Sequence, residues 1–160
     1  MQVGFYKTDG GRLCGWMAAP PKRKPFQGTT MASGRDLPHD LAQFVVEKAL
    51  GLDFGFWGLL AKGATFKSVP GRRRTEPGRK VIRAHAERLD TVEGLVNAHV
   101  NAWRAGALTP VRAALDAMLA RWRALPADEV LPLEWPARTG GGRRTRSGAE
   151  AGAGNQRCRC

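Results

Sequence analysis

The chain has 160 residues, of which 42% are hydrophobic, and its formal net charge is +12 at pH 7. A chain of this length can bury its own core without disulfides or a metal, and its most apolar charge-free run, residues 54–61, is far shorter than the ~18 residues that span a bilayer. The N-terminus does not resemble a signal peptide and the three cysteines form no disulfide or zinc-ribbon pattern, so we expect a soluble, cytoplasmic protein in its reduced form, with no membrane partner.

The N-terminal residues have the pattern of a β-hairpin. Two apolar, partly β-favouring runs, residues 3–8 and 12–18, are separated by Asp-Gly-Gly at residues 9–11. The Asp-Gly pair predicts a tight turn, because such turns require positive φ angles. The Pro-, Lys- and Gly-rich residues 20–35 are predicted to form a loop, with residues 29–31 as a candidate third strand.

The strongest helical pattern in the chain lies between residues 36 and 51. Asp36 is expected to cap a helix whose first turn contains Pro38, and Gly51 is expected to end it in the left-handed conformation. Apolar residues recur at helical spacing on one face and widen to a second face, which indicates a central helix. The residues of these two faces are Leu37, Leu41, Phe44, Val45, Val46 and Leu50.

A shorter helix is predicted to follow, with Asp53 as its expected cap and an end near Gly63. Gly55 and Gly58 lower its intrinsic stability, but they leave room for close backbone packing.

Two further helices are predicted from apolar residues that are spaced alternately by three and four. The first spans residues 79–105 and ends at Gly106, and the second begins at Thr109-Pro110 and runs to about residue 125. Because a short loop joins them, we predict that they form an antiparallel helical hairpin.

The prolines at positions 126, 132 and 136 interrupt the helical pattern, so residues 130–135 are expected to lie extended over the helices. Residues 137–160 contain no large apolar side chain and cannot offset the entropy of ordering, so they are predicted to form a basic, disordered tail rich in Gly and Arg. We therefore predict an α+β fold in a single domain, residues 1–136, with an N-terminal β-hairpin packed on a mainly helical body of about four helices.

The best candidate for a metal site is a polar stripe on the central helix. His39, Gln43 and Glu47 recur every four residues, and Asp40 follows the first of them. With histidine at position 43 the segment would resemble a helical zinc site, but a glutamine amide is a poor ligand for a transition metal. His39 and Glu47 are also about 12 Å apart along a helix. A structural role for His39, Asp40 and Glu47 is therefore the favoured interpretation, with metal binding as the alternative.

The remaining histidines and cysteines do not suggest a cofactor. His85 and His99 would lie about 21 Å apart along one helix, which is too far to share an ion, so both are expected to pack in the core. Cys158 and Cys160 supply only two ligands of an incomplete site. No complete catalytic set and no phosphate-binding glycine loop can be recognised from the spacing, and no cofactor is predicted.

Residues 37–66, LPHDLAQFVVEKALGLDFGFWGLLAKGATF, resemble a segment of small bacterial proteins of unknown function. The pattern of that family is similar to LPHDLxHFVVExxLGLxxGFWGxxAxGA and follows an N-terminal hairpin. This chain has Gln43 where the pattern has histidine. The resemblance implies membership of the family, but it implies no activity.

These patterns leave three functions open, and they do not decide whether the protein is an enzyme. The leading hypothesis is a non-enzymatic protein-interaction domain, whose contact patch would be formed by Phe54, Phe56 and Trp57. The first alternative is a metal-dependent hydrolase, or an inactive relative of one, centred on the polar stripe of the central helix. No oligomeric state follows from the pattern.

The second alternative is weak, non-specific association with nucleic acid through residues 72–80 and 138–146. Residues 67–83 contain seven basic residues and one acidic residue, and residues 137–160 contain six and one. Flexible arginines attract phosphate groups without sequence preference, although such segments also serve simply to keep a protein soluble. The candidate contacts are Arg72, Arg73, Arg74, Arg143, Arg144 and Arg146.

Overall fold

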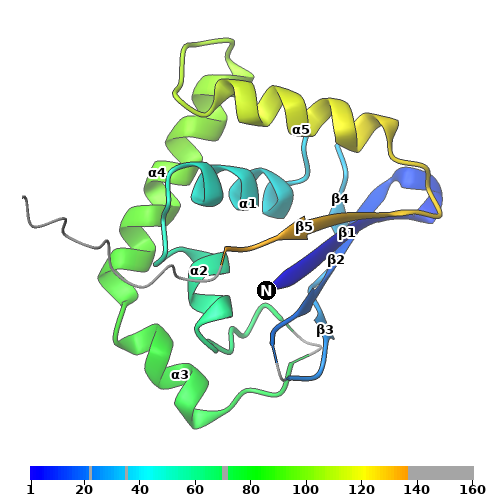
Figure 1. Ribbon diagram of the computed structural model, residues 1–160. Coiled ribbons are helices and arrows are strands. Elements are labelled where there is room, and N and C mark those ends of the chain that lie inside the picture. The colour runs from blue at the N-terminus through cyan, green and yellow to red at the C-terminus, as the bar shows by residue number, and fades with distance from the viewer. Residues whose placement is uncertain (22, 35, 70–71, 137–160) are drawn as a thin grey trace, which may run out of the picture.

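The computed structural model describes residues 1–136 with the exception of residues 22, 35, 70 and 71 (Figure 1). The predicted tail lies outside the described residues. The candidate residues that fall there are Arg143, Arg144, Arg146, Cys158 and Cys160.

The predicted hairpin is formed by β1, Gln2–Thr8, and β2, Leu13–Ala19. A short 3-10 turn over Asp9–Gly11 joins them, and all three of its residues have positive φ angles. Phe5 is paired with Trp16 in the antiparallel register, and both side chains point into the core. The Asp-Gly signal therefore identified the turn correctly.

Three further strands complete the sheet. The short strands β3, Phe26–Gln27, and β4, Met31–Ala32, both pair with β2. Strand β5, Val130–Glu134, pairs antiparallel with β1, so the order along the main path is β3-β2-β1-β5. The expectation that this segment lies over the helices was wrong, because it extends the sheet. Pro132 is compatible with this position since β5 is an edge strand.

The described residues form five helices. Their bounds are α1 His39–Ala49, α2 Phe56–Ala61, α3 Glu76–Arg83, α4 Ala86–Arg104 and α5 Arg112–Ala124. The single helix predicted over residues 79–105 is thus two helices that meet at His85. The first of them begins earlier than expected, because the Thr75 side chain caps it by accepting a hydrogen bond from the Gly78 N–H.

The last two helices do not form the predicted antiparallel hairpin. They are joined near their adjacent ends, where the indole Nε1 of Trp103 donates to Oδ1 of Asp116 at 2.7 Å. From there α4 and α5 diverge, and each packs against α1 (Figure 1). The apolar faces of both helices therefore pack against α1 and not against each other.

Helix α1 lies between the sheet and helices α4 and α5 (Figure 1), as its two apolar faces predicted. Its residues 41–47 are all buried. Aromatic side chains from β1, β2, α1 and α2 meet beneath it, with ring centroids 4.8 Å apart for Trp16 and Trp57 and 5.3 Å apart for Phe44 and Trp57. Among the described helices, none has the length and apolarity needed to cross a membrane.

Candidate functional sites around helix α1

The first turn of α1 carries His39 and Asp40. The helix begins at His39 with Pro38 at the N-cap position, so the expected cap by Asp36 is not formed. The Asp40 carboxylate accepts a hydrogen bond from the Trp16 indole at 2.7 Å, and its backbone carbonyl accepts one from the Trp57 indole at 3.1 Å. Asp40 is therefore anchored to the aromatic core.

The His39 side chain, by contrast, is 58% exposed. Its Nδ1 atom lies 3.4 Å from Oδ1 of Asp40. This hydrogen bond to a carboxylate raises the pKa of His39 above its ordinary value, although partial burial opposes the shift. His39 thus faces solvent as a base whose protonation depends on Asp40.

Glu47 is fully buried at the other end of the stripe. Its Oε1 accepts a hydrogen bond from Nε2 of Gln43 at 2.9 Å, and its Oε2 accepts backbone N–H groups of Trp57 at 3.0 Å and Gly58 at 3.4 Å. The carboxylate therefore satisfies N–H groups in the first turn of α2 that no helical carbonyl reaches. Burial raises the pKa of Glu47 to about 7, because desolvation outweighs these hydrogen bonds.

Glycine at position 55 makes this arrangement possible. A Cβ atom at Gly55 would lie 2.3 Å from the carboxyl carbon of Glu47. Likewise, a Cβ atom at Gly58 would lie 2.4 Å from the backbone oxygen of Asp53. The close packing expected of these two glycines is therefore confirmed: Gly55 packs against the buried carboxylate, and Gly58 packs against the backbone of Asp53.

The three residues predicted as metal ligands, His39, Asp40 and Glu47, do not point toward a common site. His39 faces solvent, Asp40 faces the Trp16 indole, and Glu47 faces the start of α2. In the part of the chain that the structure describes, no group of three or more His, Cys, Asp or Glu side chains is placed to hold a metal ion. The oxygens of Glu47 are already occupied by amide donors, which indicates a structural role for this carboxylate.

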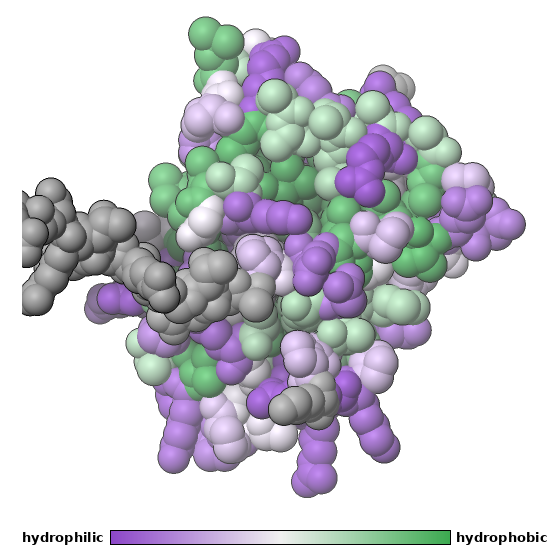
Figure 2. Space-filling model, viewed as in Figure 1, coloured by the Kyte–Doolittle hydropathy of each residue, from purple (hydrophilic) through white to green (hydrophobic). Residues whose placement is uncertain are grey.

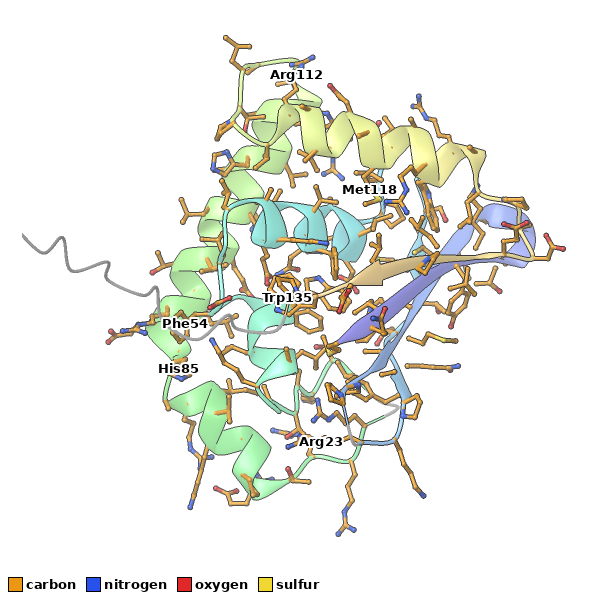
Figure 3. All side chains as sticks on the ribbon, in the orientation of Figure 1. Arg23, Phe54, His85, Arg112, Met118 and Trp135 are labelled. Atoms are coloured by element: carbon orange, nitrogen blue, oxygen red, sulfur yellow. The ribbon has the colours of Figure 1, made fainter. Side chains whose placement is uncertain are left out.

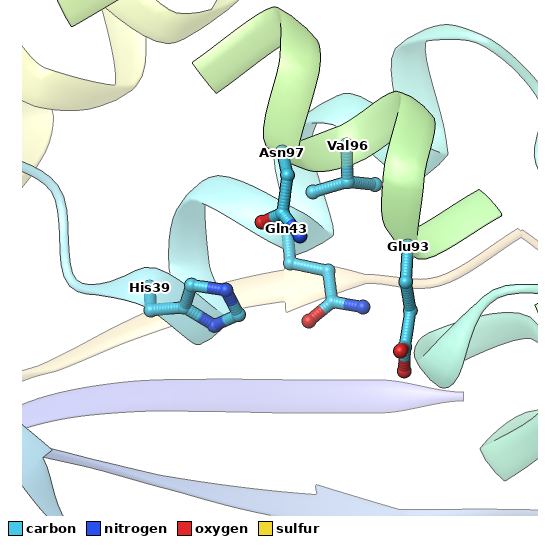
Figure 4. A pocket seen from close by; sticks show the side chains of 5 residues that line it. All are labelled: His39, Gln43, Glu93, Val96 and Asn97. Carbon is cyan, nitrogen blue, oxygen red and sulfur yellow. The ribbon is translucent and has the colours of Figure 1, made fainter. Parts of the chain in front are cut away.

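The accessible part of the stripe borders a small polar pocket between α1 and α4 (Figure 4). The pocket has a volume of about 210 Å³, and its lining residues are His39, Gln43, Glu93, Val96 and Asn97. The contribution of Glu93 and Asn97 was not predicted from the sequence. Their spacing of one helical turn was visible, but nothing in the sequence indicated that this face of α4 lies beside α1.

The opposite face of α1 borders an apolar groove. The α1–α5 groove, as we call it, has a volume of about 330 Å³ and is lined by Phe44, Val45, Lys48, Ala49, Ala114, Met118, Arg121 and Leu133. Hydrophobic residues gather over α1 and α5 on this face of the molecule (Figure 2), and Met118 lies on the side of α5 toward α1 (Figure 3). This groove was also not predicted, because the apolar residues of the helix expected from residue 109 to about residue 125 were expected to face the preceding helix.

The predicted aromatic patch is not a surface feature as a whole. Trp57 is fully buried, which contradicts its assignment to an exposed contact patch. Phe56 is partly buried and its ring lies 5.1 Å from that of Trp57. The Phe54 ring is contacted by Nζ of Lys62 at 3.8 Å and by the guanidinium of Arg88 at 4.5 Å.

The remaining histidines take part in packing. The ring of His85 lies 4.9 Å from the ring of Phe54, and Nδ1 of His99 lies 2.8 Å from Oγ1 of Thr109 (Figure 3 labels His85 and Phe54). Both side chains are half-buried.

The arginines of the basic loop differ in their environments. Arg73 and Arg74 are exposed, whereas Arg72 is partly buried and donates from Nη1 to the carbonyl of Ala64 at 2.8 Å. Its guanidinium also lies 4.6 Å above the ring of Phe26. Arg72 is therefore an ordered side chain, in contrast to the flexible one expected from the composition of the loop.

Comparison of the chain with models of known protein families, with curated proteins and with solved structures found no match. The resemblance of residues 37–66 to a small bacterial family therefore stays a prediction.

Proposed function

We propose that this protein is a non-enzymatic interaction domain that binds an amphipathic segment of another protein in the α1–α5 groove. The observation that carries the proposal is the groove itself, in which apolar side chains from α1, α5 and β5 line a hollow at the surface. Helix-in-groove recognition uses apolar anchors spaced by one helical turn, and a groove between two helices suits such anchors.

The charges at the groove indicate the chemistry of the partner. Lys48 and Arg121 lie at the groove, and no acidic side chain lines it. Nζ of Lys48 donates to the carbonyl of Glu134 at 3.0 Å, so its charge is held in place without a carboxylate partner, and Arg121 forms no ion pair within the described residues. An apolar segment flanked by acidic residues would complement this surface.

The buried polar residues support a non-enzymatic function. Asp40 and Glu47 are engaged by indole and backbone N–H groups, so neither is free to activate water. A reduced, cytoplasmic setting is part of the proposal, and it is compatible with Cys14, which is a buried free thiol.

Two synthetic helical peptides test the proposal. Both carry leucines at positions i, i+3, i+4 and i+7, and one is flanked by glutamates while the other is flanked by lysines. Fluorescence polarisation is expected to show that the glutamate-flanked peptide binds and the lysine-flanked peptide does not. Met118→Asp and Arg121→Glu should each weaken binding by about tenfold, equivalent to ~1.4 kcal/mol.

Leu108→Ser is the matched control, because Leu108 is 94% exposed and does not line the groove. This variant should bind the glutamate-flanked peptide as the unmodified protein does. The proposal is wrong if neither peptide binds, if both bind equally, or if the two groove variants bind as well as the control.

A further inference from the structure

The end of the molecule that contains β3 and α3 is strongly basic. Two segments meet there, residues 20–34 and residues 62–75, and neither contains an acidic residue. They are in contact, because Oγ1 of Thr29 donates to the carbonyl of Ser68 at 2.7 Å. The described basic residues of the two segments are Arg23, Lys24, Lys62, Lys67, Arg72, Arg73 and Arg74. Hydrophilic side chains project from this end in Figure 2.

The Arg72 guanidinium of this surface is held by two backbone carbonyls and an aromatic ring. Its Nη1 donates to the carbonyl of Ala64 at 2.8 Å and its Nη2 to that of Gly63 at 3.5 Å, while the Phe26 ring supports the guanidinium from one side. A guanidinium has five N–H donors, so three remain for another acceptor. An arginine fixed in this way loses little side-chain entropy when it binds a ligand.

Arg23 lies against the same glycine. A Cβ atom at Gly63 would be 3.0 Å from Nη1 of Arg23, so both guanidiniums approach this one residue from different segments. Within the described residues neither arginine forms an ion pair. Glu76 is the next acidic residue along the chain. It forms ion pairs with Arg79 and Arg83, so it does not neutralise Arg23 or Arg72.

We infer that Arg23 and Arg72 form the centre of a site that binds the phosphate groups of a polyanion. Two adjacent guanidiniums without a carboxylate match a tetrahedral oxyanion, which can accept hydrogen bonds from both. Such an anion would also relieve the repulsion between the two cations. Consistent with this, partial burial and the neighbouring charge of Arg23 lower the pKa of Arg72.

The site is expected to recognise phosphate without reading bases. The face of Phe26 is occupied by Arg72, and the described residues of the two segments contain no Trp or Tyr on which a base could stack. A nucleic-acid backbone and inorganic polyphosphate offer the same phosphate chemistry. This inference does not depend on the α1–α5 groove, which lies on another face.

The test uses the full-length chain and a fluorescein-labelled single-stranded dT oligonucleotide, with inorganic polyphosphate as a competitor. Arg23→Ala is expected to weaken oligonucleotide binding by about tenfold and to reduce the slope of log affinity against log salt by about one. Arg72→Lys keeps the positive charge but replaces the planar guanidinium with an ammonium group, so it should weaken oligonucleotide binding severalfold. Polyphosphate should displace the oligonucleotide.

Arg104→Ala is the control, because it changes the net charge by the same amount as Arg23→Ala but lies at the C-terminal end of α4. Its affinity for the oligonucleotide should stay within about twofold of that of the unmodified protein. A thermal melt of each variant checks folding, and the exposed Arg23 side chain keeps the test valid if Arg72→Lys is unstable. The inference is overturned if Arg23→Ala binds as Arg104→Ala does, or if polyphosphate does not compete. Competition by polyphosphate but not by inorganic phosphate would support a site extended over several phosphates.

Discussion

The side-chain amide of Gln43 donates to the carboxylate of Glu47 at 2.9 Å, one turn further along α1, and both residues are buried. The second oxygen of that carboxylate holds the first turn of α2. A single charged group in the core thus joins two helices. Because its environment disfavours the charge, the stability of the protein becomes dependent on pH.

The first prediction concerns Glu47→Gln. The pKa of Glu47 rises from 4.5 to about 7 on folding, so between these values the folded protein holds a proton that the unfolded chain releases. The free energy of unfolding therefore falls as pH rises through this range, by ~3 kcal/mol from this group. Glu47→Gln should remove this dependence and make the protein more stable than the unmodified chain at pH 8.

Urea unfolding at pH 5 and pH 8 measures the effect. Glu93→Gln is the control, because Glu93 is exposed on α4 and accepts no hydrogen bond from α2. A Glu47→Gln variant that loses as much stability between the two pH values as the unmodified protein would contradict the prediction.

The second prediction compares two glycines. Gly55→Ala places a methyl group against the buried carboxyl of Glu47, so it should lower the free energy of unfolding by about 2–3 kcal/mol. Gly94→Ala, in the exposed middle of α4, meets no atom within 4 Å and should raise it by ~1 kcal/mol. Thermal unfolding of both variants measures these changes in stability. Equal effects of the two substitutions would argue against close packing at Gly55.

The third prediction concerns the pair His39 and Asp40. Asp40→Asn should lower the pKa of His39 toward its ordinary value, because the hydrogen bond to the carboxylate is the main cause of its elevation. The asparagine oxygen can still accept the Trp16 indole N–H, so the fold should be retained. An NMR titration of the His39 ring protons measures the shift. Asp90→Asn, which changes an exposed residue of α4, should leave the pKa of His39 unaltered.

The local signals of the sequence predicted the first half of the fold well. The Asp-Gly turn is present, and Gly51 and Gly63 follow α1 and α2 with positive φ angles. These features succeed because the conformation of a turn or a helix end depends on its own residues. The break at His85 was missed because no glycine or proline marks it and the apolar spacing continues across it.

The errors in the site arose from tertiary contacts. Gln43 and Glu47 were correctly placed on one stripe, but the partner of Glu47 is the backbone at Trp57, and spacing does not reveal a backbone donor. Trp57 was expected to form a contact patch with Phe54 and Phe56. Its ring instead fills the space under α1, where Phe44 and Trp16 come from separate segments.

The pairing of β5 with β1 has a consequence for synthesis. Phe5 and Leu131 are partners in the register, although nearly all of the described residues lie between them in the sequence. While the ribosome is still adding the helices, β1 has one unpaired edge, and such an edge is a template for association with other chains. Complete pairing of the sheet must therefore await the emergence of β5 from the ribosome, so the edge of β1 stays open while the helices are being synthesised.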